Sequence, residues 1–224
     1  MSDLIALFGG TFDPVHFGHL RVCLEAGESL AAQEVRMLPS ALPPHRETPG
    51  ASSAQRLEML ELALKGQQRL TVDARELQRN GPSYTIDSLL ELRAEVGQRV
   101  PLVLLIGADQ LARLDTWKDW QKLLDHAHIA VLTRPGSKPP PHHVDAFLRA
   151  HRARKSELRD SPAGLITAID VTALSISASE IRRLVATGKN PRYLLPEPVF
   201  EYLQRHGLYQ AKPLAHLVSS MLSH

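Results

Sequence analysis

Short apolar segments alternate with amphipathic ones along this chain, and this alternation is the strongest constraint on its fold. Apolar runs of strand length occupy residues 4–8, 34–38, 70–72, 102–106, 129–133 and 166–171. Between most of them lie stretches with helical periodicity, at residues 20–30, 54–63, 85–96 and 117–124. Such an alternation is typical of a parallel sheet covered on both faces. The sequence therefore predicts a Rossmann-like α/β fold: an open parallel sheet with helices on both faces, binding ligands at the carboxyl ends of its strands.

Composition narrows the class of protein further. With 43% hydrophobic and 22% charged residues, the 224-residue chain has the make-up of a globular protein that can bury a sizeable core. A formal net charge of +2 favours an enzyme that handles small anions over a nucleic-acid-binding protein. The one cysteine, Cys23, excludes a disulfide within the chain. Because we find neither a signal-like start nor the about 20 apolar residues of a membrane span, we expect a cytoplasmic protein.

Two units of unequal size are expected within a single functional domain. Residues 1–175 hold all the predicted strands, and residues 176–224 form a small helical region packed on that core. Residues 135–142 read as a proline-rich loop. An exposed helix is expected at 144–158, where the basic residues form either a solvated face or a patch for phosphate or nucleic acid. The tail at 210–224 is either a packed helix or a means of self-association, and the oligomeric state stays open.

A glycine-rich loop follows the first predicted strand. Gly9 and Gly10 end the apolar run, and a helix is expected to begin near Gly18 and His19. The backbone N–H groups of such a loop and the positive end of the helix then face a common point, which favours an anion. Because glycine has no side chain, a phosphate can approach this backbone closely.

Two histidines flank Gly18 within the same loop. His16 and His19 are three residues apart, so both rings can point to one side of the helix start. Neutral imidazole donates one hydrogen bond and imidazolium two, and either form can bind phosphate oxygens. Two alternatives stay open: a structural pair, and a metal site, for which two histidines without a third ligand are poor.

A second motif, "ISASEIR", spans residues 176–182. Ser177 and Ser179 are both candidates for capping a helix, and Glu180 suits its first turn. If Ser179 is the N-cap, Arg182 stands at the third helical position, where its guanidinium can reach an anion at the helix end. The alternative is an ordinary capped helix with a solvated arginine.

Two further stretches carry polar groups at predicted element ends. The turn at residues 83–85 leads into a helix, and free N–H groups there can bind a carboxylate. Gly107 and Asp109 follow a buried strand, and Trp117 is expected on the next helix. An indole face can stack on a pyridine ring, although a tryptophan at such a position can equally belong to the core.

These motifs resemble a known family. The stretch "GGTFDPVHFGH" is similar to the H-x-G-H signature of the nucleotidyltransferases, and its T-F-D-P-V-H-x-G-H form resembles bacterial nicotinate-nucleotide adenylyltransferases. "ISASEIR" resembles the family's I-S-x-[ST]-x-x-R motif, which binds the triphosphate. The resemblance implies a fold of the nucleotidyltransferase type and catalytic roles for His16, His19 and Arg182. The ATP-binding residues that it implies are Gly9, Gly10, Thr11, Phe12, His16, Gly18, His19, Ile176, Ser177, Ser179 and Arg182.

The same resemblance implies a site for a second substrate. "PSYT", the G-x-D…W pattern and "PPHR" all resemble the nicotinate-nucleotide branch. The backbone at Tyr84 and Thr85 would hold the nicotinate carboxylate, Trp117 would lie against the ring, and Asp109 near ribose hydroxyls. The full set implied is His45, Arg46, Ser83, Tyr84, Thr85, Gly107, Asp109, Trp117 and Arg134. One departure is "SA" at residues 40–41, where the family often carries asparagines.

The implied reaction is transfer of an adenylyl group from ATP to nicotinate mononucleotide, giving deamido-NAD and pyrophosphate. The implied cofactor is Mg²⁺ carried by ATP and water, so no residue of the chain is assigned to a metal. Neither a nucleic acid nor a membrane is expected as a partner. Alternatives are the same chemistry on nicotinamide mononucleotide or on another phosphate such as phosphopantetheine, and a catalytically inactive module that binds nucleotide or RNA.

Overall fold

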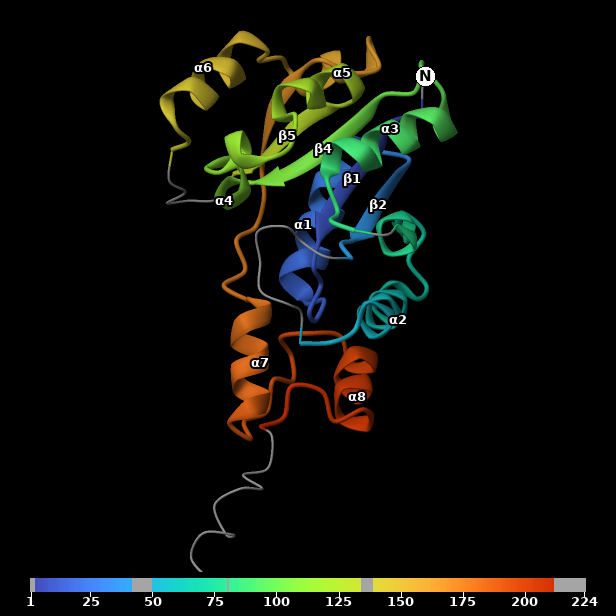
Figure 1. The fold of residues 1–224 in the computed structure, drawn as a ribbon, viewed down its shortest axis with the longest axis vertical. Coiled ribbons are helices and arrows are strands. Elements are labelled where there is room, and N and C mark those ends of the chain that lie inside the picture. Colours follow the sequence, from blue (N-terminus) through green and yellow to red (C-terminus); the bar gives the residue numbers. More distant parts are fainter. Residues whose placement is uncertain (1–2, 42–49, 80, 134–138, 212–224) are drawn as a thin grey trace, which may run out of the picture.

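Six parallel strands form one open sheet in the order β3-β2-β1-β4-β5-β6 (Figure 1). This computed structural model describes residues 3–41, 50–79, 81–133 and 139–211. The strands are β1 Ile5–Gly10, β2 Glu34–Pro39, β3 Leu70–Val72, β4 Leu102–Gly107, β5 His128–Thr133 and β6 Ile166–Asp170. Each predicted apolar run forms one of these strands, and the predicted fold class is confirmed.

Helices connect the strands and cover both faces of the sheet (Figure 1). The α-helices are α1 Phe17–Ser29, α2 Ser53–Leu64, α3 Thr85–Val96, α4 Ala108–Leu111, α5 Leu123–His126, α6 His142–Ala150, α7 Ala178–Ala186 and α8 Glu197–Arg205. Short 3-10 turns lie at η1 Arg75–Gln78, η2 Leu114–Thr116, η3 Trp120–Lys122 and η4 Lys155–Arg159. Within the described residues, no helix is both long and apolar enough to cross a membrane.

Successive residues of each strand feed two separate cores, because side chains alternate between the faces of a sheet. Ala6 and Val103 pack with α1, α2, α7 and α8, whereas Leu7 and Leu104 pack with α3, α4, α5 and α6. All four of these strand residues are buried. The near-continuous apolar character of the strands therefore reflects burial on both sides.

The C-terminal helices join the first of these cores. Ile181 of α7 and Val199 of α8 are fully buried in it. Tyr202 of α8 also donates a 2.6 Å hydrogen bond from its hydroxyl to Glu58 of α2. In Figure 1 both helices lie below the sheet, with α8 beside α2.

Two predicted helices differ from the structure. Residues 120–124 form η3 and the start of α5, and Trp117 precedes them in extended conformation. Asp119 has a left-handed φ of 51°, which is incompatible with a helix that continues from residue 117 to 124. The helix expected at 144–158 is α6, which ends at Ala150. Beyond it the chain turns to pair with β6: the Ile166 N–H donates to His151 O at 2.8 Å, and Arg152 forms a bridge with Ile166.

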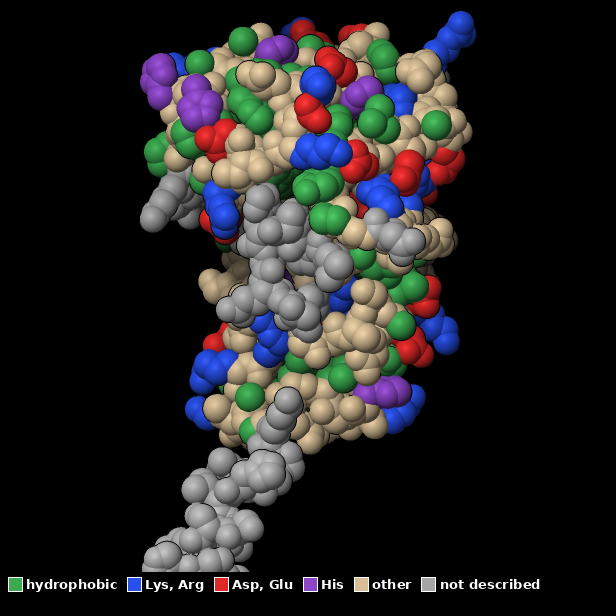
Figure 2. All heavy atoms as spheres, in the orientation of Figure 1, with side chains coloured by type: hydrophobic (Ala, Val, Ile, Leu, Met, Phe, Trp, Pro, Cys, Tyr) green, Lys and Arg blue, Asp and Glu red, His purple; other side chains and the backbone are tan. Residues whose placement is uncertain are grey.

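The basic residues of α6 and of the segment after it are engaged in contacts within the protein. Arg149 pairs with Asp145, Arg154 with Glu157, and the Lys155 ammonium donates to Ser29. Figure 2 shows acidic and basic side chains interspersed over the upper half of the face drawn there. These contacts favour the solvated-face interpretation of the 144–158 segment.

The direction in which the chain winds reverses between β1 and β4. From β1 it proceeds to β2 and β3 on one side, and from β4 to β5 and β6 on the other. Open parallel sheets bind ligands at such a point, outside the carboxyl ends of the strands. The glycine-rich motif at the end of β1 and the short helix α4 after β4, which holds Asp109, meet there.

Candidate active site

A cavity of about 370 Å³ opens at this reversal point. It is bounded by the end of β1, the N-terminal end of α3, and the segment from α4 to Lys118. Eight of the predicted site residues line it: Gly9, Gly10, Thr11, Ser83, Tyr84, Thr85, Asp109 and Trp117. Gly107 caps the adjacent helix α4, where its N–H donates to Gln110 Oε1 at 3.1 Å. The cavity therefore joins the start of the glycine-rich motif to the predicted second-substrate residues, whereas His16, His19 and Arg182 are not among the residues that line it.

The two glycines that end β1 serve different purposes. Among the described residues, no heavy atom lies within 4 Å of the position that a Gly9 Cβ would take, so a ligand can approach this backbone. A Cβ on Gly10 would stand 2.8 Å from the Phe12 ring. Phe12 is buried with a left-handed φ of 50°, and Gly10 leaves the room that its ring needs.

The two histidines of the motif stack on each other at the start of α1. Their ring centroids are 3.7 Å apart and the two ring planes are nearly parallel. The Phe12 ring packs edge-on against His19, with 5.1 Å between the two ring centroids. Helix α1 begins at Phe17, one residue before the predicted start, and His16 is its N-cap. Both rings consequently lie at the positive end of a 13-residue helix, where an anion is favoured.

Gly18 lets the second motif come up against the first. A Cβ there would lie 3.0 Å from the His16 ring and 3.4 Å from the carbonyl oxygen of Ile176. The segment before α7 therefore passes directly beside the histidines. Gly18 and Ile176 are 158 positions apart in the chain, and they can lie this close because Gly18 has no side chain.

Helix α7 is capped by Ser177, whose Oγ accepts a hydrogen bond from the Glu180 N–H at 3.2 Å. Ser179 lies inside the helix, so of the two candidate caps Ser177 is the N-cap. Arg182 thus stands on the second turn instead of the third helical position. Its guanidinium still reaches the first motif, where Nη1 donates to the Asp13 carbonyl at 2.7 Å.

Asp13 joins these segments, and it is a residue that the sequence did not single out. Its carboxylate accepts hydrogen bonds from the Gly50 N–H at 2.8 Å, the Ala51 N–H at 3.1 Å and the Tyr209 hydroxyl at 2.6 Å. It also lies 3.6 Å from Arg182 Nη1 and is 4% exposed. The aspartate of the "FDP" sequence could have signalled this role.

Arg56 supports the same loop from α2. It is fully buried, and its guanidinium donates to the carbonyl of Thr11 at 2.7 Å and to that of Ala41 at 3.2 Å. Burial lowers the pKa of this guanidinium, and the nearby Asp13 opposes that effect. In the sequence Arg56 is one more polar residue of an amphipathic helix, so nothing there marks it.

The opposite wall of the cavity is the N-terminal end of α3. Tyr84 is the N-cap, and among the described residues no side chain caps this end. Lys118 contacts the side chains of this helix end. Its ammonium lies 3.1 Å from the Asp87 carboxylate and 4.9 Å from the centre of the Tyr84 ring. The first backbone N–H groups of α3 therefore stand at the cavity without a side-chain partner, as a carboxylate site requires.

For Trp117 the sequence left two alternatives, a ring that faces the substrate and a ring that belongs to the core, and its position is compatible with both. Its ring lines the cavity, and it also packs against the core between the sheet and α3. Gln110, Arg113 and Lys118 line the same side of the cavity and were not predicted. Three predicted site residues, His45, Arg46 and Arg134, lie outside the described residues.

The family model described as cytidylyltransferase-like matches residues 7–184, a span that includes both motifs and the whole sheet. The chain therefore belongs to the cytidylyltransferase-like family, a family of nucleotidyltransferases.

Its relatives specify the branch. A protein of Pseudomonas aeruginosa strain UCBPP-PA14 named "Probable nicotinate-nucleotide adenylyltransferase" is 49% identical over 212 residues, which cover 94% of this chain and 99% of the relative. A protein of the same name from Marinobacter nauticus is 47% identical over 210 residues, covering 93% and 97%. The resemblance predicted from the motifs is confirmed.

A solved structure shares the fold at lower identity. The nicotinic acid mononucleotide adenylyltransferase of Plasmodium falciparum, complexed with NaAD, superposes with a TM-score of 0.70. It is 16% identical, and the match covers 92% of this chain and 97% of that one.

Proposed function

We propose that the protein transfers the adenylyl group of ATP to nicotinate mononucleotide, forming deamido-NAD and pyrophosphate. The observation that supports this most is the placement of two kinds of donor at the cavity and at the loop beside it. Imidazole and guanidinium groups gather at the loop after β1, whose residues Gly9, Gly10 and Thr11 line the cavity; we call this the β1 side. The N-terminal end of α3, which no side chain of the described residues caps, lines the cavity on what we call the α3 side. The names of the two bacterial relatives give the same reaction.

In this reaction a phosphate oxygen of the mononucleotide attacks the α-phosphorus of ATP. The new O–P bond forms as the bond to the bridging oxygen of the β-phosphate breaks, and pyrophosphate leaves. Because the attacking oxygen is already ionised at neutral pH, no general base is needed. What the protein must supply is alignment of two polyanions and stabilisation of the charge that develops between them.

His16, His19 and Arg182 are the residues that we assign to this task. The stacked imidazoles at the positive end of α1 would donate to the α-phosphate and the leaving pyrophosphate. Arg182, held beside the same loop by Asp13, would add a fixed positive charge. His45 and Arg46 remain candidates for further phosphate contacts, and Arg134 remains a candidate for contact with the nucleotide.

The second substrate would occupy the α3 side of the cavity. The N–H groups at Tyr84 and Thr85 would bind the nicotinate carboxylate, with Trp117 against the ring and Asp109 near ribose hydroxyls. A carboxylate gains more from a helix N-terminus than an uncharged amide does. We therefore propose nicotinate mononucleotide over nicotinamide mononucleotide.

Mg²⁺ would enter as the complex with ATP. Mg²⁺ prefers oxygen ligands, whereas the side chains at the phosphate side are mainly nitrogen donors. The Asp13 carboxylate there already accepts three hydrogen bonds. Within the described residues, no group of three or more His, Cys, Asp or Glu side chains could hold a metal ion. When bound, the ion would neutralise phosphate charge.

Pyrophosphate release tests the proposal. The purified protein is mixed with ATP and Mg²⁺ and with either nicotinate or nicotinamide mononucleotide, and kcat/KM is measured for each. We expect release with both and a kcat/KM at least about tenfold higher for the acid. Equal values, or a preference for the amide, would overturn the assignment of the second substrate. Absence of release with either would overturn adenylyl transfer to a pyridine mononucleotide.

A further inference from the structure

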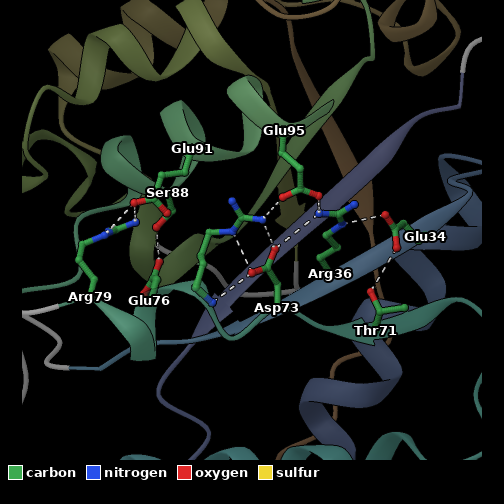
Figure 3. Close-up of polar contacts among 10 residues, drawn as sticks. Glu34, Arg36, Thr71, Asp73, Glu76, Arg79, Ser88, Glu91 and Glu95 are labelled. Atoms are coloured by element: carbon green, nitrogen blue, oxygen red, sulfur yellow. Dashed lines mark hydrogen bonds and ion pairs between the residues drawn. The ribbon is translucent and has the colours of Figure 1, made fainter. Parts of the chain in front are cut away.

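A buried acid lines the same cavity on the α3 side, and nothing so far has used it. Glu76 belongs to the turn η1, between β3 and α3, and is 7% exposed. Its side chain points toward the first turn of α3 (Figure 3). A carboxylate in this place is costly unless it is well hydrogen-bonded.

The surroundings of Glu76 differ from those of the other carboxylates in Figure 3. Each of the others drawn there pairs with an arginine, as Glu91 does with Arg79 at 2.7 Å. Glu76 instead accepts a 2.7 Å hydrogen bond from the hydroxyl of Ser88. Burial raises the pKa of Glu76, and hydrogen bonds from Ser88 and Ser83 oppose that rise.

These two serines bracket the uncapped end of α3. Ser83 precedes the N-cap Tyr84, and Ser88 is the fourth residue of the helix. The Ser83 hydroxyl accepts a hydrogen bond from the Ala41 N–H at 3.0 Å, which links the residue before the N-cap to the loop after β2. The Glu76 carboxylate is thus tied to the first turn of α3 through Ser88, and Ser83, Tyr84 and Thr85 line the same cavity as Glu76.

We propose that Glu76 is a positioning residue that selects the acid over the amide. By holding Ser88 in the first turn of α3, it fixes the direction of the backbone N–H groups at residues 84 and 85. A carboxylate needs several donors aimed at it, whereas an amide gains little from them. Glu76 therefore acts through the turn, and it has no part in the transfer at the α-phosphate. This inference rests on the proposed function.

The test compares three variants of Glu76 and its partner Ser88, which together we call the bracket, with one matched control. Glu76→Ala removes the acceptor, Glu76→Gln leaves one carbonyl oxygen to accept from the Ser88 hydroxyl, and Ser88→Ala removes that donor. Glu91→Gln changes an acid of the same helix α3 that is half exposed and pairs with Arg79. For each protein we measure the KM values of ATP and of both mononucleotides, kcat, and the calorimetric Kd of each mononucleotide.

Glu76→Ala is expected to raise the KM and Kd of nicotinate mononucleotide by about tenfold or more. The values for nicotinamide mononucleotide, the KM of ATP and kcat should stay within about twofold. Glu76→Gln and Ser88→Ala should give smaller shifts in the same direction, and Glu91→Gln should match the unmodified protein. The ratio of acid to amide affinity is the decisive readout, since general loss of structure would not change it selectively.

An unchanged acid-to-amide ratio in all three bracket variants would overturn the inference, and so would equal losses for both mononucleotides and ATP. If Glu76→Ala does not fold, Glu76→Gln and Ser88→Ala decide. Failure of the proposed function looks different, because the unmodified protein would then release no pyrophosphate. In that case the calorimetric ratio for acid and amide still tests Glu76 by itself.

Discussion

The two sides of the cavity are built on different principles. On the β1 side, segments far apart in the chain are tied together by two buried ionic groups, Asp13 and Arg56. On the α3 side, the donors are backbone N–H groups of one short stretch, braced by a hydroxyl–carboxylate bracket. Changes on the first side should therefore affect the rate of transfer, and changes on the second should affect the choice and binding of substrate.

The largest effect should come from the histidines of the β1 side. We expect His19→Ala or His16→Ala to lower kcat by about 100-fold or more, because each removes a donor to charge that develops during transfer. Pyrophosphate release at saturating substrates measures this. His143→Ala, at an exposed histidine of α6 that contacts Asp115, is the control and should be unaffected. Near-normal turnover of either motif variant would remove the catalytic role assigned to its imidazole.

The brace of the β1 side should matter next. Asp13→Asn removes the negative charge beside Arg182 and turns an amide N–H₂ toward groups that now donate to a carboxylate. We expect kcat to fall about 30-fold and the free energy of unfolding to fall by about 2–4 kcal/mol. Turnover and urea denaturation measure the two losses.

Asp170→Asn, at the end of β6, is the control and should change neither kcat nor the free energy of unfolding. A normal kcat for Asp13→Asn would mean that the catalytic role of Arg182 does not depend on the Asp13 carboxylate.

On the α3 side, Trp117→Ala should alter binding and leave the transfer step alone. Loss of a stacked ring is worth about 1–3 kcal/mol, so we expect the KM of nicotinate mononucleotide to rise about tenfold with kcat little changed. Trp120→Ala is the matched control, since that ring packs edge-on against Phe147 at 4.9 Å. It should lower stability without raising KM. An equal effect of both variants on KM would mean that Trp117 serves only the core.

The smallest effect concerns a histidine that belongs to neither side. His128 of β5 is fully buried. Its Nδ1 accepts a hydrogen bond from the Leu165 N–H at 3.1 Å, so the ring proton is on Nε2, which donates to the carbonyl oxygen of Ser161 at 2.9 Å. Burial lowers the pKa of His128 below the unfolded value of about 6.5. Between the two pKa values the unfolded chain binds more protons, so stability falls as pH drops below about 6.5.

Thermal unfolding between pH 7.5 and pH 5 checks this expectation. His128→Gln should be less stable than the unmodified protein at pH 7.5, because hydrogen bonds are lost. The difference should shrink toward pH 5, because glutamine does not bind a proton. A constant difference across this range would contradict the role given to His128 and leave the pH dependence to other groups.

Much of the fold follows from the sequence, because burial on both faces imposes apolar strands that any pattern search finds. The helices predicted at 117–124 and 144–158 were wrong because of the conformation and pairing of the backbone. The left-handed Asp119 and the pairing of Arg152 with Ile166 override side-chain periodicity that favours a helix. Tertiary contact of the main chain leaves no trace in the spacing of apolar residues.

The site divides in the same way. Its motif residues were found because loops and helix ends have characteristic sequences, and Ser83, Tyr84 and Thr85 were found at the start of α3. Asp13, Arg56 and Glu76 were missed because their partners are mostly backbone or hydroxyl groups of other segments. Such roles depend on which loops the fold brings together, and one sequence does not contain that information.

The hydrogen bond from Tyr209 to Asp13 has a consequence for how the protein is made. Synthesis runs from the N-terminus, so this tyrosine is among the last of the described residues to leave the ribosome, 196 positions after its acceptor. A copy that ends before Tyr209 lacks one of the three donors that hold the aspartate beside Arg182. We therefore expect the motif loop to gain its full set of contacts only after this tyrosine has been made.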